Sequence, residues 1–508
     1  MLRGFPDFAK FTSFWTCQRL SGAILAFGVL VRLVQYFANR SLWADEAVLA
    51  LNLIDRSYAE LFQPLDYNQA APIGFLLVEK FFLEVLGNNE YVLRLFPFLC
   101  AIASLFCFYE LAKSVLVRQA VPIALALFVS LNYLVYYAAE VKQYSTDVAV
   151  AVGLCWAMLP LLQLKFGLRN ILLYMGVGAI AVWLSHPAIF VLAALGTIAF
   201  FRAIKTRSIP TILPVVEVGI VWLLSFGGFY IASLSAIGDN ADLVDSWGKG
   251  FMPSPWALGW LFDRLVKFFD RPLGFPENFI GDIALAVCAI GYFSFWKRNR
   301  EGFSIVLLPV GFTLLASYLK KYPFRDRLLL FLTPFFILAI AEGASYFWRM
   351  TRNHRVKWIT AIAIGLILVP SLASTAYLLV QPQQREEIKP TIEYVKKHQQ
   401  PGDLLYIFQR GEYQFKYYAP KYGYSEGDYI IGVDDLEDGE EVSPEEWRRY
   451  QQDFDRLRGN SRVWMLFSHT DGAKEEEKMV LDYLDRIGQK IDSLESFGAF
   501  VYLYDFSL

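Results

Sequence analysis

Asp45 and Glu46 form the first polar cluster whose residue types suit acid–base chemistry. They follow a long apolar run and head a shorter apolar stretch, Val48–Ile54, which favours a helix along a membrane surface. A carboxylate at a lipid–water boundary can take a proton from an acceptor hydroxyl, which is general-base catalysis. The alternative is a structural role, because acidic residues are favoured at helix N-termini as caps and dipole partners.

A second cluster, Tyr136–Asp147, joins two apolar runs and contains Glu140, Lys142 and Tyr144. A turn needs none of these charges to form, and acids close to a membrane core are costly. The cluster is therefore a candidate for substrate binding. The competing interpretation is an aromatic belt at the membrane surface, with a lysine that extends its ammonium group to water.

Four cations lie within eight residues in Lys320–Arg327, and two of them are Arg325 and Arg327. Arginine presents a planar fork that matches phosphate oxygens, so the segment is typical of a phosphate or pyrophosphate site. The spacing of two places both arginines on one face of an extended segment, with Asp326 opposite. The alternative is an anchor at the membrane surface.

His186 is a further candidate for substrate binding, in the sequence Leu184-Ser185-His186-Pro187 between two apolar runs. A purely structural histidine is the alternative. The sequence contains no Gly-rich phosphate loop, no HExxH, no nucleophile elbow and no Cys/His metal spacing. These absences argue against an ATP-driven machine. The five cysteines lie in or beside apolar runs and form no disulfide framework.

Composition divides the 508 residues into a membrane body and an acidic tail. Hydrophobic residues make up 56% and charged residues 19% of the chain, against about 45–50% and 25% in soluble domains. Residues 1–380 have a net charge of +8, whereas residues 381–508 have a net charge of −10. The sequence therefore predicts a transmembrane domain over 1–380 and a soluble domain over 381–508. Nucleic-acid binding, which requires a basic face, is disfavoured.

Apolar runs of spanning length predict about eleven transmembrane helices. The shorter run 72–86 carries Glu79, Lys80 and Glu84, which favours a helix at the interface with its charges toward water. Charged residues inside spans are expected to face the bundle, and these are Arg32, Arg94, Glu110, Glu217 and Glu342. The predicted spans are 20–38, 91–112, 119–138, 145–164, 170–185, 187–201, 211–234, 280–296, 303–319, 328–347 and 358–380.

The distribution of Lys and Arg predicts the orientation, because cytoplasmic loops are enriched in positive charge. If 72–86 does not span, the segments on the N-terminal side of the membrane hold 17 Lys and Arg but only two acids, Asp7 and Glu301. The N-terminus is then cytoplasmic, and the loop 39–90 and the tail are extracytoplasmic. The tail reads as an α/β domain with helices at Thr391–His398, Pro444–Leu457 and Lys474–Ile487, and strands at Leu404–Phe408, Arg462–Phe467 and Ala499–Tyr504.

The order and sidedness of these features resemble the GT-C glycosyltransferases. The features are Asp45-Glu46 after the first span, the long loop 39–90 with its helix at Pro72, the Tyr137–Asp147 turn and the Tyr322–Pro334 segment. Within that superfamily the chain is similar to the bacterial family-39-like group of protein mannosyltransferases and aminoarabinose transferases. The resemblance implies a multi-pass helical fold with interfacial helices in the first outer loop, in the plasma (inner) membrane.

The resemblance also implies an inverting, single-displacement transfer of a sugar from a polyprenyl-phosphate donor to a lipid, glycan or protein acceptor. Asp45 would be the general base, supported by Glu46. Lys142, Arg325 and Arg327 would hold the lipid phosphate, and Glu140 and Tyr144 would line the same cavity. Gln69 stands where some relatives have an acid–lysine pair before the loop proline, so no dedicated metal site and no cofactor are expected. The alternatives are a transporter or flippase of a lipid-linked or anionic solute, and an inactive envelope scaffold.

Overall fold

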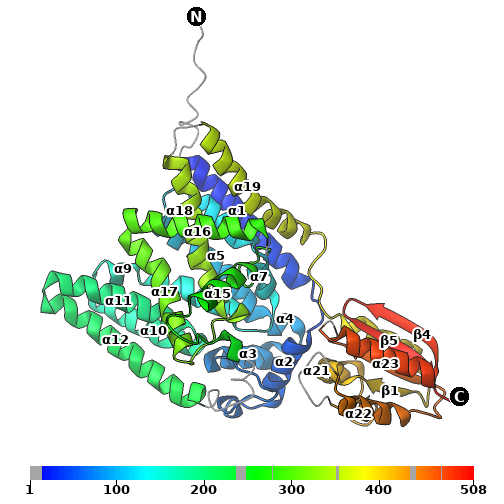
Figure 1. Ribbon diagram of the computed structural model, residues 1–508. Helices are drawn as coiled ribbons and strands as arrows, with labels where there is room; N and C mark the ends of the chain where they lie inside the picture. The colour runs from blue at the N-terminus through cyan, green and yellow to red at the C-terminus, as the bar shows by residue number, and fades with distance from the viewer. Residues whose placement is uncertain are drawn as a thin grey trace, which may run out of the picture. The chain divides into compact units, whose positions relative to one another are not determined.

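The computed structural model describes residues 14–235, 247–276, 278–350, 354–434, 442–470 and 472–507. Arg3 and Lys10, which contribute to the predicted charge bias, lie outside these ranges. The chain forms two compact units. The helical unit comprises the residues up to Ala38 together with Arg56–Pro382, and the second unit combines Asn39–Asp55 with Gln383–Leu508. Figure 1 shows the elements of both units in chain order.

Eight helices among the described residues are long and apolar enough to cross a membrane, which defines a multi-pass membrane protein. Five are α1 (Phe14–Phe37), α5 (Leu95–Val115), α11 (Ala188–Thr206), α16 (Phe279–Arg298) and α17 (Arg300–Tyr318). The sixth joins α12 (Ile209–Phe229) to the π-helix η4 (Tyr230–Leu234), the seventh joins the 3-10 helix η6 (Asp326–Leu332) to α18 (Thr333–Met350), and the eighth lies within α19 (His354–Tyr377).

The three other predicted spans take less regular forms. The run 119–138 is a bent pair, α6 (Val121–Ser130) followed by α7 and η3 (Asn132–Ala139), with an angle of 63° between them. The run 170–185 is the 17-residue α10 (Leu168–Leu184), and the run 145–164 is α8 (Tyr144–Ala157) with α9 (Leu159–Leu162). The polytopic fold is confirmed, but the count of about eleven spans is not.

Arg32 of α1 stabilises the break between α6 and α7. The last carbonyl groups of a helix lose their helical donors, which is costly in a membrane. The Arg32 guanidinium donates hydrogen bonds to the carbonyl oxygens of Phe128 and Val129 at 3.3 and 3.4 Å. The Thr375 hydroxyl, from α19, donates to the carbonyl oxygen of Ser130 at 2.6 Å. Arg32 is therefore buried in the bundle, as predicted.

Two other intramembrane charges are also buried as predicted. Arg94 and Glu342 are at most 2% exposed, and the Glu342 carboxylate accepts hydrogen bonds from Arg298 and Arg349. The prediction is wrong for two acids. Glu110 is partly exposed and pairs with Lys113, and Glu217 is exposed because α12 is one of the least covered helices of the bundle.

The predicted interfacial helix 72–86 is α3 (Ile73–Leu86), which starts after Pro72 and stops at Gly87 with a φ of +91°. Its charges do not all turn toward water as predicted. Lys80 and Glu84 form a partly exposed ion pair, but Glu79 is 0% exposed. The reason is the helical period: Glu79 lies three or four residues from the buried apolar side chains that form the inner face, namely Phe75, Leu76 and Leu83.

Helix α18 lies at the centre of the helical unit, and 94% of its span with η6 is buried. It packs closely against α16, as Figure 1 shows. Gly291 of α16 faces the Ala339 carbonyl, and Gly343 of α18 faces the Val287 carbonyl, so neither position has room for a Cβ atom. Small residues permit such close helix approach in membranes. This packing holds η6, and with it the cationic segment, in a defined place.

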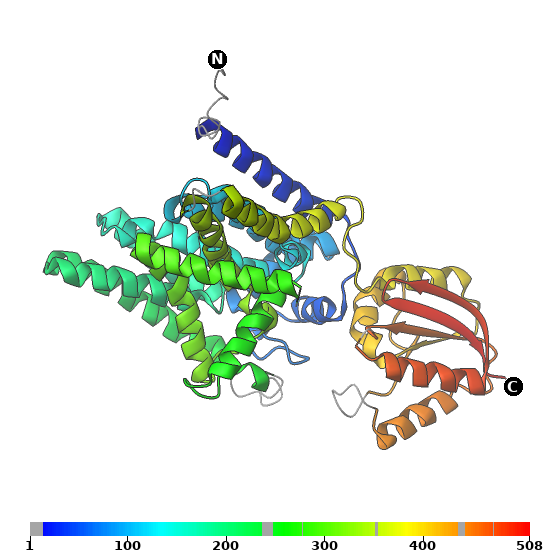
Figure 2. The ribbon, with the colours of Figure 1, turned by 45° about the horizontal axis from the view of Figure 1, so that its top comes forward.

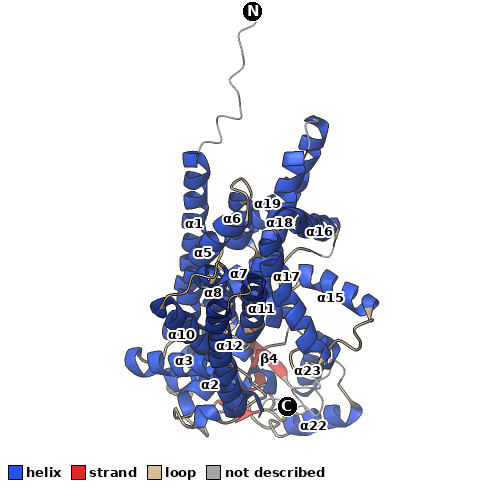
Figure 3. Cartoon of the chain, turned by 90° about the vertical axis from the view of Figure 1, so that its left-hand side faces the viewer, coloured by secondary structure: helices blue, strands red, loops and turns tan. Residues whose placement is uncertain are grey.

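The α/β tail is confirmed. A five-stranded sheet of order β2-β1-β3-β5-β4 is parallel at β1 (Leu404–Ile407), β2 (Ile430–Ile431) and β3 (Val463–Ser468), and antiparallel at β4 (Gln489–Ser496) and β5 (Ala499–Asp505). Helix α20 (Ile388–His398) covers one face, and α22 (Pro444–Asp455) and α23 (Lys474–Ile487) cover the other (Figure 2). Figure 3 shows that the described strands are confined to this domain. Sequence patterns missed β2, β4 and the short α21 (Glu412–Tyr418).

Candidate functional site

Asp45 and Glu46 occupy the first turn of α2 (Ala44–Asp55), and their environments differ. Glu46 is 0% exposed; its carboxylate lies 3.3 Å from the Arg40 guanidinium and accepts a hydrogen bond from the Trp43 amide. This is the geometry in which an acid at the third helical position caps its own helix. Asp45 is partly exposed. Of the two predicted acids, Glu46 is thus engaged in structure, and Asp45 is the one accessible to a substrate.

The Tyr136–Asp147 segment is buried throughout, although it connects two apolar runs. Glu140 is 0% exposed and Lys142 is 4% exposed. The Lys142 ammonium group donates a hydrogen bond to the Gln69 side-chain oxygen at 2.6 Å, so it does not extend to water as the competing interpretation requires. Burying an ammonium group without partners is costly. A buried lysine at this end of the bundle therefore indicates a built polar site.

Arg325 and Arg327 do not share one face as predicted. The 3-10 helix η6 begins at Asp326, whose φ is +45°, so the alternation of an extended strand is lost. Arg325 instead forms an ion pair with Asp326 at 2.7 Å, with both side chains more than a third exposed. The Arg327 guanidinium lies over the Tyr144 ring, 5.6 Å from its centroid. Arg327 is therefore the arginine that meets the Tyr136–Asp147 segment.

Three segments distant in sequence come together here. The Tyr137 hydroxyl interacts electrostatically with Glu140, Tyr144 and Arg327. Tyr322 donates a hydrogen bond to the Leu328 carbonyl at 2.8 Å. Burial, followed by the charges of Asp147 and Tyr144, raises the pKa of Tyr322 well above its usual value. With Gln69 from the first loop, these residues define what we call the polar cluster: Gln69, Tyr137, Glu140, Lys142, Tyr144, Asp147, Tyr322 and Arg327.

His186 lies beside this cluster through its neighbour Ser185, which is next to Asp147. Its ring packs against Phe229 with 5.6 Å between the centroids. Burial lowers the pKa of the His186 imidazole to about 4, so the side chain is neutral at pH 7. His186 can therefore accept or donate a hydrogen bond, but it supplies no positive charge to a phosphate.

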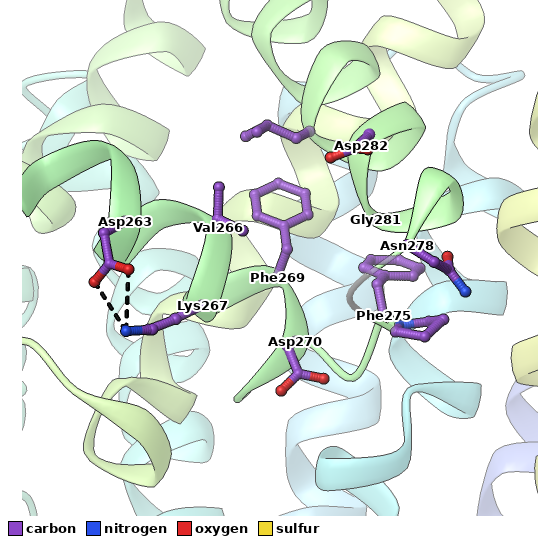
Figure 4. Close-up of a pocket in the computed structure, with 11 residues that line it drawn as sticks. Asp263, Val266, Lys267, Phe269, Asp270, Phe275, Asn278, Gly281 and Asp282 are labelled. Carbon is purple, nitrogen blue, oxygen red and sulfur yellow. Dashed lines mark hydrogen bonds and ion pairs between the residues drawn. The ribbon is translucent and has the colours of Figure 1, made fainter. Parts of the chain in front are cut away.

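A pocket of about 350 Å³ lies elsewhere in the helical unit, between α15 (Leu258–Asp270) and the start of α16. Figure 4 shows Asp263 paired with Lys267 at one side, with the ring of Phe269 in the middle and that of Phe275 at the other side, beside Asn278. None of the predicted site residues lines it. Its polar side chains are exposed or already paired, which is typical of a surface hollow.

The helix that forms this hollow has a strongly apolar face. Leu258 and Phe262 of α15 are 71% and 64% exposed, and Trp256, two residues before the helix, is 86% exposed. Helix α15 connects two spans. We expect this face to enter the lipid–water interface. Brominated phospholipids should then quench Trp256, and the Trp256→Phe variant should lose a defined fraction of the quenching seen in the wild-type protein. Equal quenching in both proteins, with unbrominated vesicles as the reference, would place α15 in water.

The sequence did not predict the positions of two buried or cluster residues, Gln69 and Glu79. Gln69 belongs to a loop without regular structure, and nothing in its spacing indicates contact with Lys142, 73 residues away. Glu79, which like Asp147 interacts electrostatically with Cys100, was predicted to face water because of its charge. Its spacing of four residues from both Phe75 and Leu83 was the signal that could have predicted its burial. Among the described residues no group of three or more His, Cys, Asp or Glu side chains is arranged to hold a metal ion.

The chain has the fold of solved GT-C proteins. No protein-family model matches the sequence, and no curated protein matches it either. Among solved structures, the chain is similar to ArnT from Cupriavidus metallidurans, with 10% identity and a TM-score of 0.51 over 95% of this chain and 98% of that one. ArnT has been solved in the apo state and, at the same similarity, bound to undecaprenyl phosphate.

The chain is also similar to the archaeal oligosaccharyltransferase AglB from Archaeoglobus fulgidus. That structure, in complex with an inhibitory peptide and a dolichol-phosphate, has 9% identity and a TM-score of 0.53 over 96% of this chain and 74% of AglB. At these identities the comparisons establish the fold, including the helical body followed by a C-terminal domain. The predicted resemblance to GT-C proteins is confirmed at this level.

Proposed function

We propose that this protein is a membrane glycosyltransferase that moves a sugar from a polyprenyl-phosphate donor to a lipid, glycan or protein acceptor. The observation that carries the proposal is the polar cluster, which contains the buried Lys142 and also Arg327, whose guanidinium lies over the Tyr144 ring. Lipid phosphates occupy proteins of the same fold, undecaprenyl phosphate in ArnT and dolichol-phosphate in AglB.

The proposed reaction is a single displacement. The acceptor hydroxyl oxygen attacks the anomeric carbon from the side opposite the phosphate, the bond from that carbon to the phosphate oxygen breaks, and the configuration inverts. Asp45 takes the hydroxyl proton as general base, which typically contributes 10²–10⁴-fold to such reactions. Glu46 keeps the first turn of α2 in place through Arg40 and the Trp43 amide. The leaving group is polyprenyl phosphate.

The departing phosphate needs positive charge, because stabilising the charge that develops is the largest part of such catalysis. We assign this role to Lys142 and Arg327, with Arg325 as an outer contact. Glu140 and Tyr144 orient the two cations, and His186 offers a neutral hydrogen bond to the sugar. We propose no dedicated cofactor; treatment with EDTA followed by an activity assay tests this, and loss of turnover that Mg²⁺ or Mn²⁺ restores would reject it.

Transfer by purified protein is the direct test. The protein, reconstituted in liposomes with radiolabelled polyprenyl-phosphate sugars and envelope glycolipid or protein acceptors, should produce a labelled product and free polyprenyl phosphate. Movement of the labelled donor across the bilayer without transfer would identify a transporter instead. Neither transfer nor movement, with any of a panel of donors, would leave a scaffold as the function.

The proposed face of the membrane is extracytoplasmic, on the basis of the 17-to-2 ratio of basic to acidic residues. Asn88 and Glu445 are exposed in the structure, and neither side chain caps a helix. Single cysteines placed at these positions in a cysteine-free background should react with an impermeant maleimide in intact cells. Reaction at either position only after permeabilisation would reverse or reject the proposed topology.

A further inference from the structure

The segment that leads into α2 is built into the C-terminal unit, more than 340 residues further along the chain. Two consecutive acids precede α20 and bind this segment. The Glu387 carboxylate accepts hydrogen bonds from both the backbone amide and the hydroxyl of Ser41, each at 2.9 Å. The Glu386 carboxylate accepts a hydrogen bond from the Ala44 amide at 3.0 Å. Ala44 is the residue immediately before Asp45.

Helix α21 binds Leu42, which lies between Ser41 and Ala44. The Tyr418 hydroxyl oxygen accepts a hydrogen bond from the Leu42 amide at 2.8 Å. The Gln414 side-chain amide donates to the Leu42 carbonyl and to the Glu386 carboxylate, both at 2.9 Å. Together with Glu386 and Glu387, these side chains bind three of the four backbone amides from Ser41 to Ala44.

Side chains complete the attachment. The Arg385 guanidinium lies 3.2 Å from the centroid of the Trp43 ring, and the His469 imidazole bonds to the Glu386 carboxylate at 2.8 Å. Glu386 is 3% exposed and carries three hydrogen-bonding partners. Hydrogen bonds to an ionised carboxylate are about twice as strong as neutral ones. This network therefore fixes the entry of α2 within the C-terminal unit.

We propose that Glu386 is a positioning residue for the general base, and that the C-terminal domain serves catalysis by fixing the first turn of α2. Glu387, Gln414 and Tyr418 share this role. The inference rests on the proposed function, because Asp45 matters only if it takes the acceptor proton. A displacement of about 1 Å can reduce a rate about 10²-fold. Removing the hydrogen bond from the Ala44 amide to Glu386 should therefore displace Asp45 without changing the Asp45 side chain itself.

The test compares Glu386→Ala with a matched control in the same domain. Asp403 is a carboxylate that is 2% exposed and accepts hydrogen bonds from Arg462 and Trp464, away from the α2 segment. Hydrogen exchange of the 39–47 peptide should rise in Glu386→Ala and remain unchanged in Asp403→Ala. In Glu386→Ala, kcat should fall by about tenfold or more while the donor KM stays within about twofold, the pattern of an interaction used only in the transition state.

Conservative replacement supplies the second readout. Glu386→Gln keeps an oxygen for the Ala44 amide and should recover much of the lost kcat. Gln414→Ala and Tyr418→Phe each remove one hydrogen bond to Leu42. If Glu386→Ala does not fold, hydrogen exchange and kcat are measured in these two variants instead. Unchanged exchange in 39–47 would overturn the attachment, and raised exchange with normal kcat would overturn the positioning role. Normal turnover in Asp45→Asn would instead reject the proposed base, whatever the exchange data show.

Discussion

Asp45→Asn is expected to reduce turnover by about 10²-fold or more, because the amide cannot accept the proton of the acceptor hydroxyl. The substitution nearly preserves the shape of the side chain. Asp45 is partly exposed, so the fold and the melting temperature should change little. The measurement is kcat for sugar transfer with saturating donor and acceptor, together with a thermal unfolding curve.

Glu46→Gln is the matched control for this experiment. Glu46 is fully buried against Arg40, and breaking a buried ion pair leaves an uncompensated charge that costs about 3–5 kcal/mol. The control should therefore lose stability, whereas Asp45→Asn loses turnover. Near-normal kcat in Asp45→Asn would contradict the assignment of the base. Glu46 would then be the next acid to test.

The second large effect is expected at Arg327. Lysine keeps the charge but lacks the planar fork that binds two phosphate oxygens and stacks on an aromatic ring. Since Arg327 lies over Tyr144, Arg327→Lys should raise the KM for the polyprenyl-phosphate donor by about tenfold, the effect of about 1.4 kcal/mol. Steady-state kinetics with varied donor measure this effect.

Arg325→Lys provides the control, two residues away in the same segment. Arg325 is paired with Asp326, and exposed ion pairs contribute little. Its replacement should raise the donor KM much less than Arg327→Lys does, and it should leave stability close to that of the wild-type protein. Unchanged donor KM in Arg327→Lys, or equal effects of the two substitutions, would indicate that both arginines only anchor the helix at the interface.

Local patterns predicted much of the fold. Helices α3, α20, α22 and α23 were found within a few residues of their bounds, since each has an apolar face of helical period. The edge strand β4 was missed because its side chains are mostly exposed, so its sequence lacks an apolar face. Helix α21 was missed because its seven residues are fewer than a periodic pattern needs.

The candidate site was predicted in its residue types but not in its contacts. Lys142 and Glu140 were chosen because charges near a membrane core are costly, and both are buried. The relation of Arg325 to Arg327 was mispredicted because a positive φ at Asp326 is a local backbone detail that side-chain alternation does not reveal. Contacts such as Ser41 with Glu387 join residues 346 apart, and one sequence contains no information on such pairs.

The break between α6 and α7 has a consequence for the order in which the protein matures. Its carbonyl groups obtain one partner, Arg32, from a helix synthesised before them, and another, Thr375, from a helix synthesised about 245 residues later. During translation the Ser130 carbonyl therefore lacks its hydrogen bond from Thr375 until α19 has been synthesised. A ribosome stalled before α19 would hold a chain whose α6–α7 junction is open to water or to insertion factors, and completion of α19 would close it.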